Sequence, residues 1–101
     1  MKLIELNIAK IIDICRNHKV KSLAVFGSVL TDRFNDKSDI DFLIDFENVS
    51  LDSFDYVDNF LSLLTSLENL LGRTVDLVVG ASMRNKYFIQ NVNRTKKVIY
   101  G

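Results

Sequence analysis

The clearest strand pattern in the chain lies at residues 38–46, SDIDFLIDF, where apolar and polar side chains alternate. Successive side chains of a strand point to opposite faces of a sheet, so an alternation of this kind predicts a strand with two different faces. One face would carry Ile40, Phe42, Ile44 and Phe46, and the other Asp39, Asp41, Leu43 and Asp45. We therefore predict a strand from Asp39 to Phe46 with an acidic side.

On either side of this strand, the sequence predicts helices packed on a small mixed sheet. Apolar residues recur every three to four positions in residues 3–18, 53–71 and 83–92, as they do in helices with one buried face. Short apolar runs at 22–26, 74–79 and 97–100 predict three more strands, and the polar residues 32–38 predict a loop. Asp52 or Ser53 is a natural helix N-cap, and Gly72 is a natural helix end. This order of elements indicates an α/β or α+β fold.

The length and composition limit the class of protein. A chain of 101 residues is too short for two independent cores, so we expect one domain over residues 1–101. Its single cysteine excludes an internal disulfide and suits a reducing compartment. The longest uninterrupted apolar runs, at 23–27 and 77–81, are far shorter than the roughly 20 residues that span a bilayer. We therefore expect a cytoplasmic protein without a membrane partner.

The formal net charge is zero, but the charges are unevenly distributed. Residues 32–76 carry eleven acidic and three basic side chains, whereas residues 77–101 carry five basic side chains and no acidic one. An acidic centre beside a basic end is compatible with chance on a small surface. It is equally compatible with a cation site flanked by groups that hold an anion.

Asp39 and Asp41 are the strongest candidates for chemistry. Two positions apart on a strand, they lie on one face with Cα atoms roughly 6–7 Å apart. Carboxylates this close repel each other unless a cation lies between them, and their hard oxygen atoms suit Mg²⁺. The spacing alone also fits an ordinary solvated strand face, because ten aspartates in a chain of this length produce about one such pair by chance.

Two further features favour a site over a solvated face. Asp76 lies inside the apolar run VDLVV, where an aspartate is disfavoured unless it faces water at a sheet edge or is paired or metal-bound. Gly27 and Ser28 follow an apolar strand, where a sharp turn with free N–H groups and a hydroxyl can bind phosphate. A phosphate-binding turn and three carboxylates on neighbouring strands together describe a metal–triphosphate site.

These residues resemble the signature of the DNA polymerase β-like nucleotidyltransferase superfamily. The matching pieces are FGS at 26–28, SDIDFLI at 38–44 and LLGRTVDLV at 70–78. The ending of the chain also matches, with RN at 84–85, FI at 88–89, RT at 94–95 and IYG at 99–101. Together they cover nearly the whole chain and are most similar to the minimal nucleotidyltransferase (MNT) group, the MntA-type antitoxins of HEPN/MNT toxin–antitoxin systems. The resemblance implies a polymerase β-like fold.

The resemblance also implies roles for individual residues. Gly27 and Ser28 would hold the triphosphate of ATP, and Asp39 and Asp41 would bind Mg²⁺, with two ions expected. Asp76 would be the third catalytic carboxylate, which helps to position the metal and activates the attacking hydroxyl. We expect Asp45 to lie outside this set, although it shares the strand face.

One position departs from the superfamily pattern. Many relatives have an arginine three residues after the serine of the turn, and Thr31 stands there in this chain. Arg33 is the candidate to take its place as a nucleotide-binding cation.

The implied activity is Mg²⁺-dependent transfer of AMP from ATP to a protein hydroxyl. The chain has no room for the acceptor domain of larger relatives, so the acceptor should belong to a partner. The resemblance suggests that this partner is a HEPN-domain ribonuclease toxin modified on a tyrosine, and no direct binding of nucleic acid is expected. Two alternatives stay open: a binding-only antitoxin that occludes the toxin, and a transferase for a small hydroxylated molecule.

Overall fold

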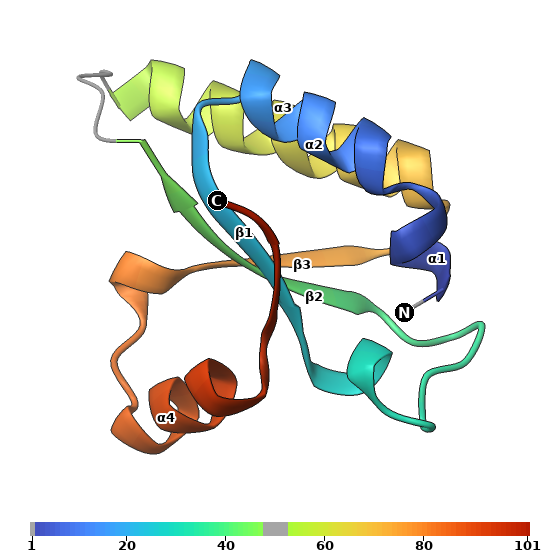
Figure 1. Ribbon diagram of the computed structural model, residues 1–101. Helices are drawn as coiled ribbons and strands as arrows, with labels where there is room; N and C mark the ends of the chain where they lie inside the picture. The colour runs from blue at the N-terminus through green and yellow to red at the C-terminus, as the bar shows by residue number, and fades with distance from the viewer. Residues whose placement is uncertain (1, 48–52) are drawn as a thin grey trace.

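The computed structural model describes residues 2–47 and 53–101, which form a four-stranded mixed sheet with helices on both faces (Figure 1). The strand order is β3-β2-β1-β4. The central pair, β1 (Val20–Phe26) and β2 (Ile40–Phe46), is antiparallel. At the edges, β3 (Val75–Val79) runs parallel to β2, and β4 (Lys97–Tyr100) runs antiparallel to β1. The predicted mixed sheet is confirmed.

The helices are divided between the two faces of the sheet. One face is covered by α1 (Lys2–Leu6), α2 (Ile8–Asn17) and α3 (Ser53–Leu71), and α4 (Lys86–Thr95) lies on the other (Figure 1). Short 3₁₀ turns follow two of the strands: η1 (Gly27–Leu30) after β1 and η2 (Gly80–Ser82) after β3. No helix in the described residues is long and apolar enough to cross a membrane.

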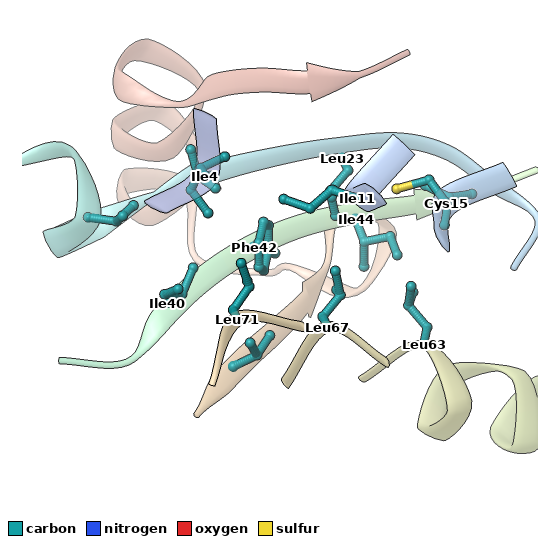
Figure 2. Packing of buried hydrophobic residues seen from close by; sticks show 14 residues of the cluster. Ile4, Ile11, Cys15, Leu23, Ile40, Phe42, Ile44, Leu63, Leu67 and Leu71 are labelled. Atoms are coloured by element: carbon teal, nitrogen blue, oxygen red, sulfur yellow. The ribbon is translucent and has the colours of Figure 1, made fainter. Parts of the chain in front are cut away.

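The sheet has a large core on one face and a small one on the other. The large core lies between the sheet and the helices α1, α2 and α3. It includes the side chains that Figure 2 labels, namely Ile4, Ile11, Cys15, Leu23, Ile40, Phe42, Ile44, Leu63, Leu67 and Leu71. On the α4 side the buried cluster is smaller and contains Ala24, Phe26, Leu43 and Val92. Because both faces of β1 are covered, its residues 23–26 are all apolar and buried rather than alternating. The weakly packed α4 side leaves room for a cavity.

Two helix boundaries differ from the sequence prediction. Residues 3–18 form two helices instead of one, because Asn7 leaves the helical conformation (φ −113°, ψ 11°) and donates its side-chain amide to the Leu3 carbonyl at 2.8 Å. The last helix begins at Lys86 and not at Met83, because the Asn85 side chain accepts a hydrogen bond from the Phe88 N–H and caps it.

Other predicted boundaries agree with the structure. The long helix ends at Leu71 and is followed by Gly72 in the left-handed conformation (φ +64°), as predicted for a helix end. The predicted N-cap at Asp52 or Ser53 lies outside the described side chains.

Cys15 should be unreactive in the native protein. It is fully buried on α2, and burial raises the pKa of its thiol from 9.0 to about 11. Since the thiolate is the reactive form, we expect iodoacetamide at pH 8 to label unfolded protein completely and native protein hardly at all, as measured by mass spectrometry. Because the folded pKa is the higher one, the stability that this thiol contributes is full below pH 9 and lost as the pH rises through about 11.

The matched variant is Cys15→Ala, which should be less stable at neutral pH because it leaves a cavity. Its urea midpoint should fall less steeply than that of the wild type between pH 9 and 11. Rapid labelling of the native thiol, or identical pH profiles for the two proteins, would contradict the burial.

Candidate active site

The three candidate carboxylates meet where β2 and β3 run side by side. Asp39 precedes β2 directly, Asp41 is the second residue of β2, and Asp76 is the second residue of β3. The parallel register pairs the Cα of Asp41 with the Cα of Asp76. The two strands are therefore neighbours, as the three-carboxylate hypothesis requires. β3 is also an edge strand and Asp76 is exposed, so the description of this residue as facing water at a sheet edge is confirmed, and its role as a metal ligand stays a prediction.

Asp41 is electrostatically coupled to the other two acids. Its pKa is raised above the ordinary 3.8, first by burial and then by the negative charges of Asp76 and Asp39. A cation beside Asp41 would offset both repulsions, and carboxylate oxygens are the donors that Mg²⁺ prefers. Within residues 2–47 and 53–101, no three carboxylate, imidazole or thiol side chains already form a complete metal-binding group. Ligation of a metal by these acids therefore stays a prediction.

Gly27 brings the turn after β1 against Asp41. Phe26, the last residue of β1, is paired with Asp41, and Gly27 then adopts a left-handed conformation (φ +76°) that side chains disfavour. A Cβ atom at Gly27 would lie 2.5 Å from the Asp41 Oδ2 atom, far inside contact distance. Glycine is thus required at this turn both by the backbone conformation and by the approach of the carboxylate.

The segment after Gly27 is braced by a threonine hydroxyl. The Thr31 side chain donates to the Ser28 carbonyl at 2.9 Å, and its oxygen accepts from the Arg33 N–H at 3.2 Å. Thr31 thus holds the turn in shape. The Arg33 side chain, which follows, is exposed and lines the same cavity as Ser28.

A cavity of about 730 Å³ lies between this turn and α4. Its volume falls within the usual range for pockets that hold small molecules, roughly 300–1,000 Å³. The lining residues come from the end of β1, from η1 and the loop after it, from β2 and from α4: Phe26, Gly27, Ser28, Leu30, Thr31, Arg33, Asp41, Phe88, Asn91, Val92 and Thr95. Four sequence-predicted site residues, Gly27, Ser28, Arg33 and Asp41, are therefore brought to one cavity. Asp39 and Asp76 do not line the cavity, but their negative charges act on Asp41, which does.

The α4 wall of the cavity was not predicted. Phe88, Asn91, Val92 and Thr95 recur at the spacing of one helix face, so their periodicity could have grouped them, but not placed them beside Gly27. The neighbouring Tyr87 lines a separate, smaller hollow of about 250 Å³ with Gln90, Asn91 and Arg94.

Arg73 positions the loop that leads to Asp39. Its guanidinium donates to the Ser38 carbonyl at 2.6 Å and to the Asn35 carbonyl, and it lies 4.5 Å from the centre of the Phe34 ring. These contacts tie the loop before β2 to the turn before β3. Arg73 therefore holds together the two segments that carry Asp39 and Asp76, a role that its place in the sequence does not reveal.

Three other side chains with polar or reactive groups lie outside this cavity. The Asp45 carboxylate is further along β2, where a Cβ on Gly80 would come within 2.8 Å of it. His18 caps α2, with Nδ1 at 2.7 Å from the Ile14 carbonyl oxygen. Cys15 is buried in the large core. None of the three lines the 730 Å³ cavity.

The sequence matches a family profile described as polymerase beta, nucleotidyltransferase, over residues 9–101. The chain is also 38% identical, over 93 residues, to a Methanocaldococcus jannaschii protein provisionally named a protein adenylyltransferase. That alignment covers 84% of this chain and 90% of the relative.

Solved structures with a similar fold include toxin–antitoxin complexes. One is a crystal structure of a toxin–antitoxin with AMP-PNP, with a TM-score of 0.71, 28% identity, and coverage of 94% of this chain and 73% of that one. Another is a tri-AMPylated Shewanella oneidensis HEPN toxin in complex with an MNT antitoxin. Its TM-score is 0.65 at 27% identity, with 96% of this chain and 71% of that chain covered.

Proposed function

Because this chain belongs to the polymerase beta nucleotidyltransferase family, we propose that it transfers AMP from ATP to a protein hydroxyl, a tyrosine of a partner HEPN ribonuclease toxin. In this role it is a cytoplasmic antitoxin. The observation that carries the proposal is the meeting of the Gly27–Ser28 turn with Asp41 in one cavity large enough for a nucleotide.

The relatives support the choice of nucleotide and of acceptor. AMP-PNP, an ATP analogue, is present in one similar toxin–antitoxin structure, and the HEPN toxin of another carries AMP groups while in complex with an MNT antitoxin. The M. jannaschii relative is provisionally named for the same transfer to protein. A partner toxin as the acceptor agrees with all three.

We assign Mg²⁺ binding, with two ions, to Asp39, Asp41 and Asp76. The donor set suits this ion because it consists of carboxylates. The pKa of Asp41 is raised first by burial and then by the charges of Asp76 and Asp39, and a cation would offset those two charges. When bound, Mg²⁺ would neutralise charge on the triphosphate and lower the pKa of the attacking hydroxyl.

The residues of the chain bind and orient the reactants. Gly27 lets the backbone approach the phosphates, to which Ser28 donates from its N–H and hydroxyl, and Arg33 supplies a positive charge on the same wall. The acceptor oxygen forms a bond to the α-phosphorus while the bond to pyrophosphate breaks. The hydroxyl proton passes to the carboxylate of Asp76, and AMP stays on the acceptor. Such chemistry depends on positioning and charge, not on a nucleophilic side chain.

A binding-only antitoxin is the second candidate, favoured by one observation. Thr31 stands where the superfamily pattern described above has an arginine. Its hydroxyl donates to the Ser28 carbonyl and accepts from the Arg33 N–H, and it supplies no positive charge for the phosphates. Neutralisation of the toxin would then rest on occlusion alone.

Transfer of label from α-labelled ATP separates the two candidates. The chain is mixed with a candidate HEPN partner protein, Mg²⁺ and α-labelled ATP, and the label on the HEPN protein is measured. We expect wild type and the control Asp13→Asn, an exposed change on α2, to label the partner. The double variant Asp39→Asn/Asp41→Asn should label it at least about 100-fold less. Inhibition of the ribonuclease that survives both the double substitution and omission of ATP would establish occlusion instead.

A further inference from the structure

We infer that Thr95 and Asn91, one turn apart on α4, read the nucleobase in the 730 Å³ cavity and select a 6-aminopurine over a 6-oxopurine. The inference rests on the proposed function, because it concerns the far end of the nucleotide whose phosphates lie at Gly27 and Ser28. It assigns base selectivity to a helix on which the sequence shows no site.

The cavity has two chemically different walls. One carries the phosphate-binding turn with Arg33 and the carboxylate of Asp41. The other is formed by α4, which contributes an aromatic ring, an amide and a hydroxyl but no charged side chain to the lining. A nucleotide with its phosphates held at the turn would therefore place its uncharged base against α4.

The hydroxyl of Thr95 can act toward a ligand only as an acceptor while its internal bond lasts. It donates its one hydrogen to the Asn91 carbonyl at 2.7 Å, which leaves its lone pairs for a donor on the ligand. The amino group at position 6 of adenine is such a donor. The 6-oxo group of hypoxanthine is an acceptor, so it would face lone pairs or force Thr95 to give up its bond to Asn91.

The amide of Asn91 offers the complementary donor. Its Oδ1 accepts from the Arg94 guanidinium at 3.2 Å, which orients the amide and leaves Nδ2 to donate. Among the described residues, no acceptor is bonded to Nδ2. An acceptor on α4 next to a donor matches adenine, whose amino group adjoins a ring nitrogen that accepts.

Phe88 provides apolar surface for the base without reading it. Its ring packs edge-on against Phe26, with centroids 5.9 Å apart and an interplanar angle of 80°, and it is 41% exposed. Stacking on such a ring is insensitive to the group at position 6. Phe88 should therefore contribute affinity, while Thr95 and Asn91 contribute selectivity.

The test compares ATP with ITP, whose bases differ in the group at position 6 and in the hydrogen that hypoxanthine carries on N1. Binding of each nucleotide with Mg²⁺ is measured by isothermal titration calorimetry. We expect the wild type to bind ATP roughly three- to tenfold more tightly than ITP, the effect of one neutral hydrogen bond. Thr95→Val should lower the ratio, and Thr95→Ser, which keeps the oxygen, should retain it. Phe88→Ala should weaken both nucleotides about fivefold or more and leave the ratio unchanged.

The matched control is Thr65→Val, the same change at an exposed position of α3 on the opposite face of the sheet. It should leave both affinities unaltered. An ATP/ITP ratio that is the same in wild type and Thr95→Val would overturn the inference, and continued AMP transfer to the partner would show that the proposed function stands. Absence of binding of either nucleotide to folded wild-type protein would overturn both.

Discussion

Replacing Asp41 with asparagine should raise the thermal stability of the protein while it abolishes AMP transfer. The carboxylate is half-buried, and its pKa is raised above the ordinary 3.8 by burial and by the charges of Asp76 and Asp39. Because the pKa of Asp41 is higher in the folded than in the unfolded protein, the stability linked to this group is full below the unfolded pKa. It is lost as the pH rises through the folded pKa. At neutral pH the charge therefore opposes folding, and the neutral isostere removes that cost.

The same substitution removes the centre of the proposed metal site. Transfer of AMP should fall by about 100- to 1,000-fold or more, the range seen when a group that stabilises developing charge is lost. Calorimetry should show a melting temperature a few degrees above wild type without Mg²⁺. Added Mg²⁺ should raise the melting temperature of the wild type more than that of the variant, because a ligand stabilises the state that binds it.

The control for both measurements is Asp13→Asn, which removes one negative charge from the exposed face of α2. It should leave transfer and the Mg²⁺ response as they are in the wild type. A variant at Asp41 that melts below wild type and still transfers AMP would show that this carboxylate is a structural residue.

The second large effect is expected at Gly27, where glycine is required for two separable reasons. Gly27 and Gly72 both have positive φ angles, +76° and +64°, so alanine at either position should cost about 1–2 kcal/mol of stability. Of these two glycines, Gly27 is the one where the new Cβ would also meet a side chain, 2.5 Å from the Asp41 Oδ2 atom. At Gly72 nothing lies within 4 Å of the new Cβ. The pair separates backbone strain from the contact with Asp41.

Gly27→Ala should therefore lose activity far in excess of its loss of stability. Displacement of a catalytic group by about 1 Å can reduce a rate about 100-fold, and we expect a loss of that order in AMP transfer. Gly72→Ala should show a lower urea midpoint with nearly full transfer activity. Equal activities in the two variants would mean that the approach of Gly27 to Asp41 has no catalytic role.

Much of the fold could be predicted from local patterns, since those patterns report which side of an element is buried. The alternation at 39–46 predicted β2, which the structure places at Ile40–Phe46, and the last strand agrees at Lys97–Tyr100. The break at Asn7 and the start of α4 at Lys86 were missed. Both depend on a single asparagine side chain that bonds to nearby backbone, and helical periodicity does not register such a bond.

The candidate site divides in the same way. The sequence by itself determined which side chains can carry the chemistry, because the turn at Gly27, the acidic pair and the aspartate within an apolar run are each unusual for their local surroundings. The family resemblance joined them into one hypothesis, and the parallel pairing of β2 with β3 agrees with it.

Only the tertiary structure decided what faces those residues. α4 lies on the opposite side of the sheet from the other helices (Figure 1). It brings Phe88, Asn91 and Thr95 to the cavity beside Gly27. These residues lie 61 to 68 positions after Gly27 in the sequence, and their own segment looks like an ordinary amphipathic helix. Their place follows from the docking of Val92 on the small core and from the pairing of β4 with β1, which are long-range packing interactions that no local pattern encodes.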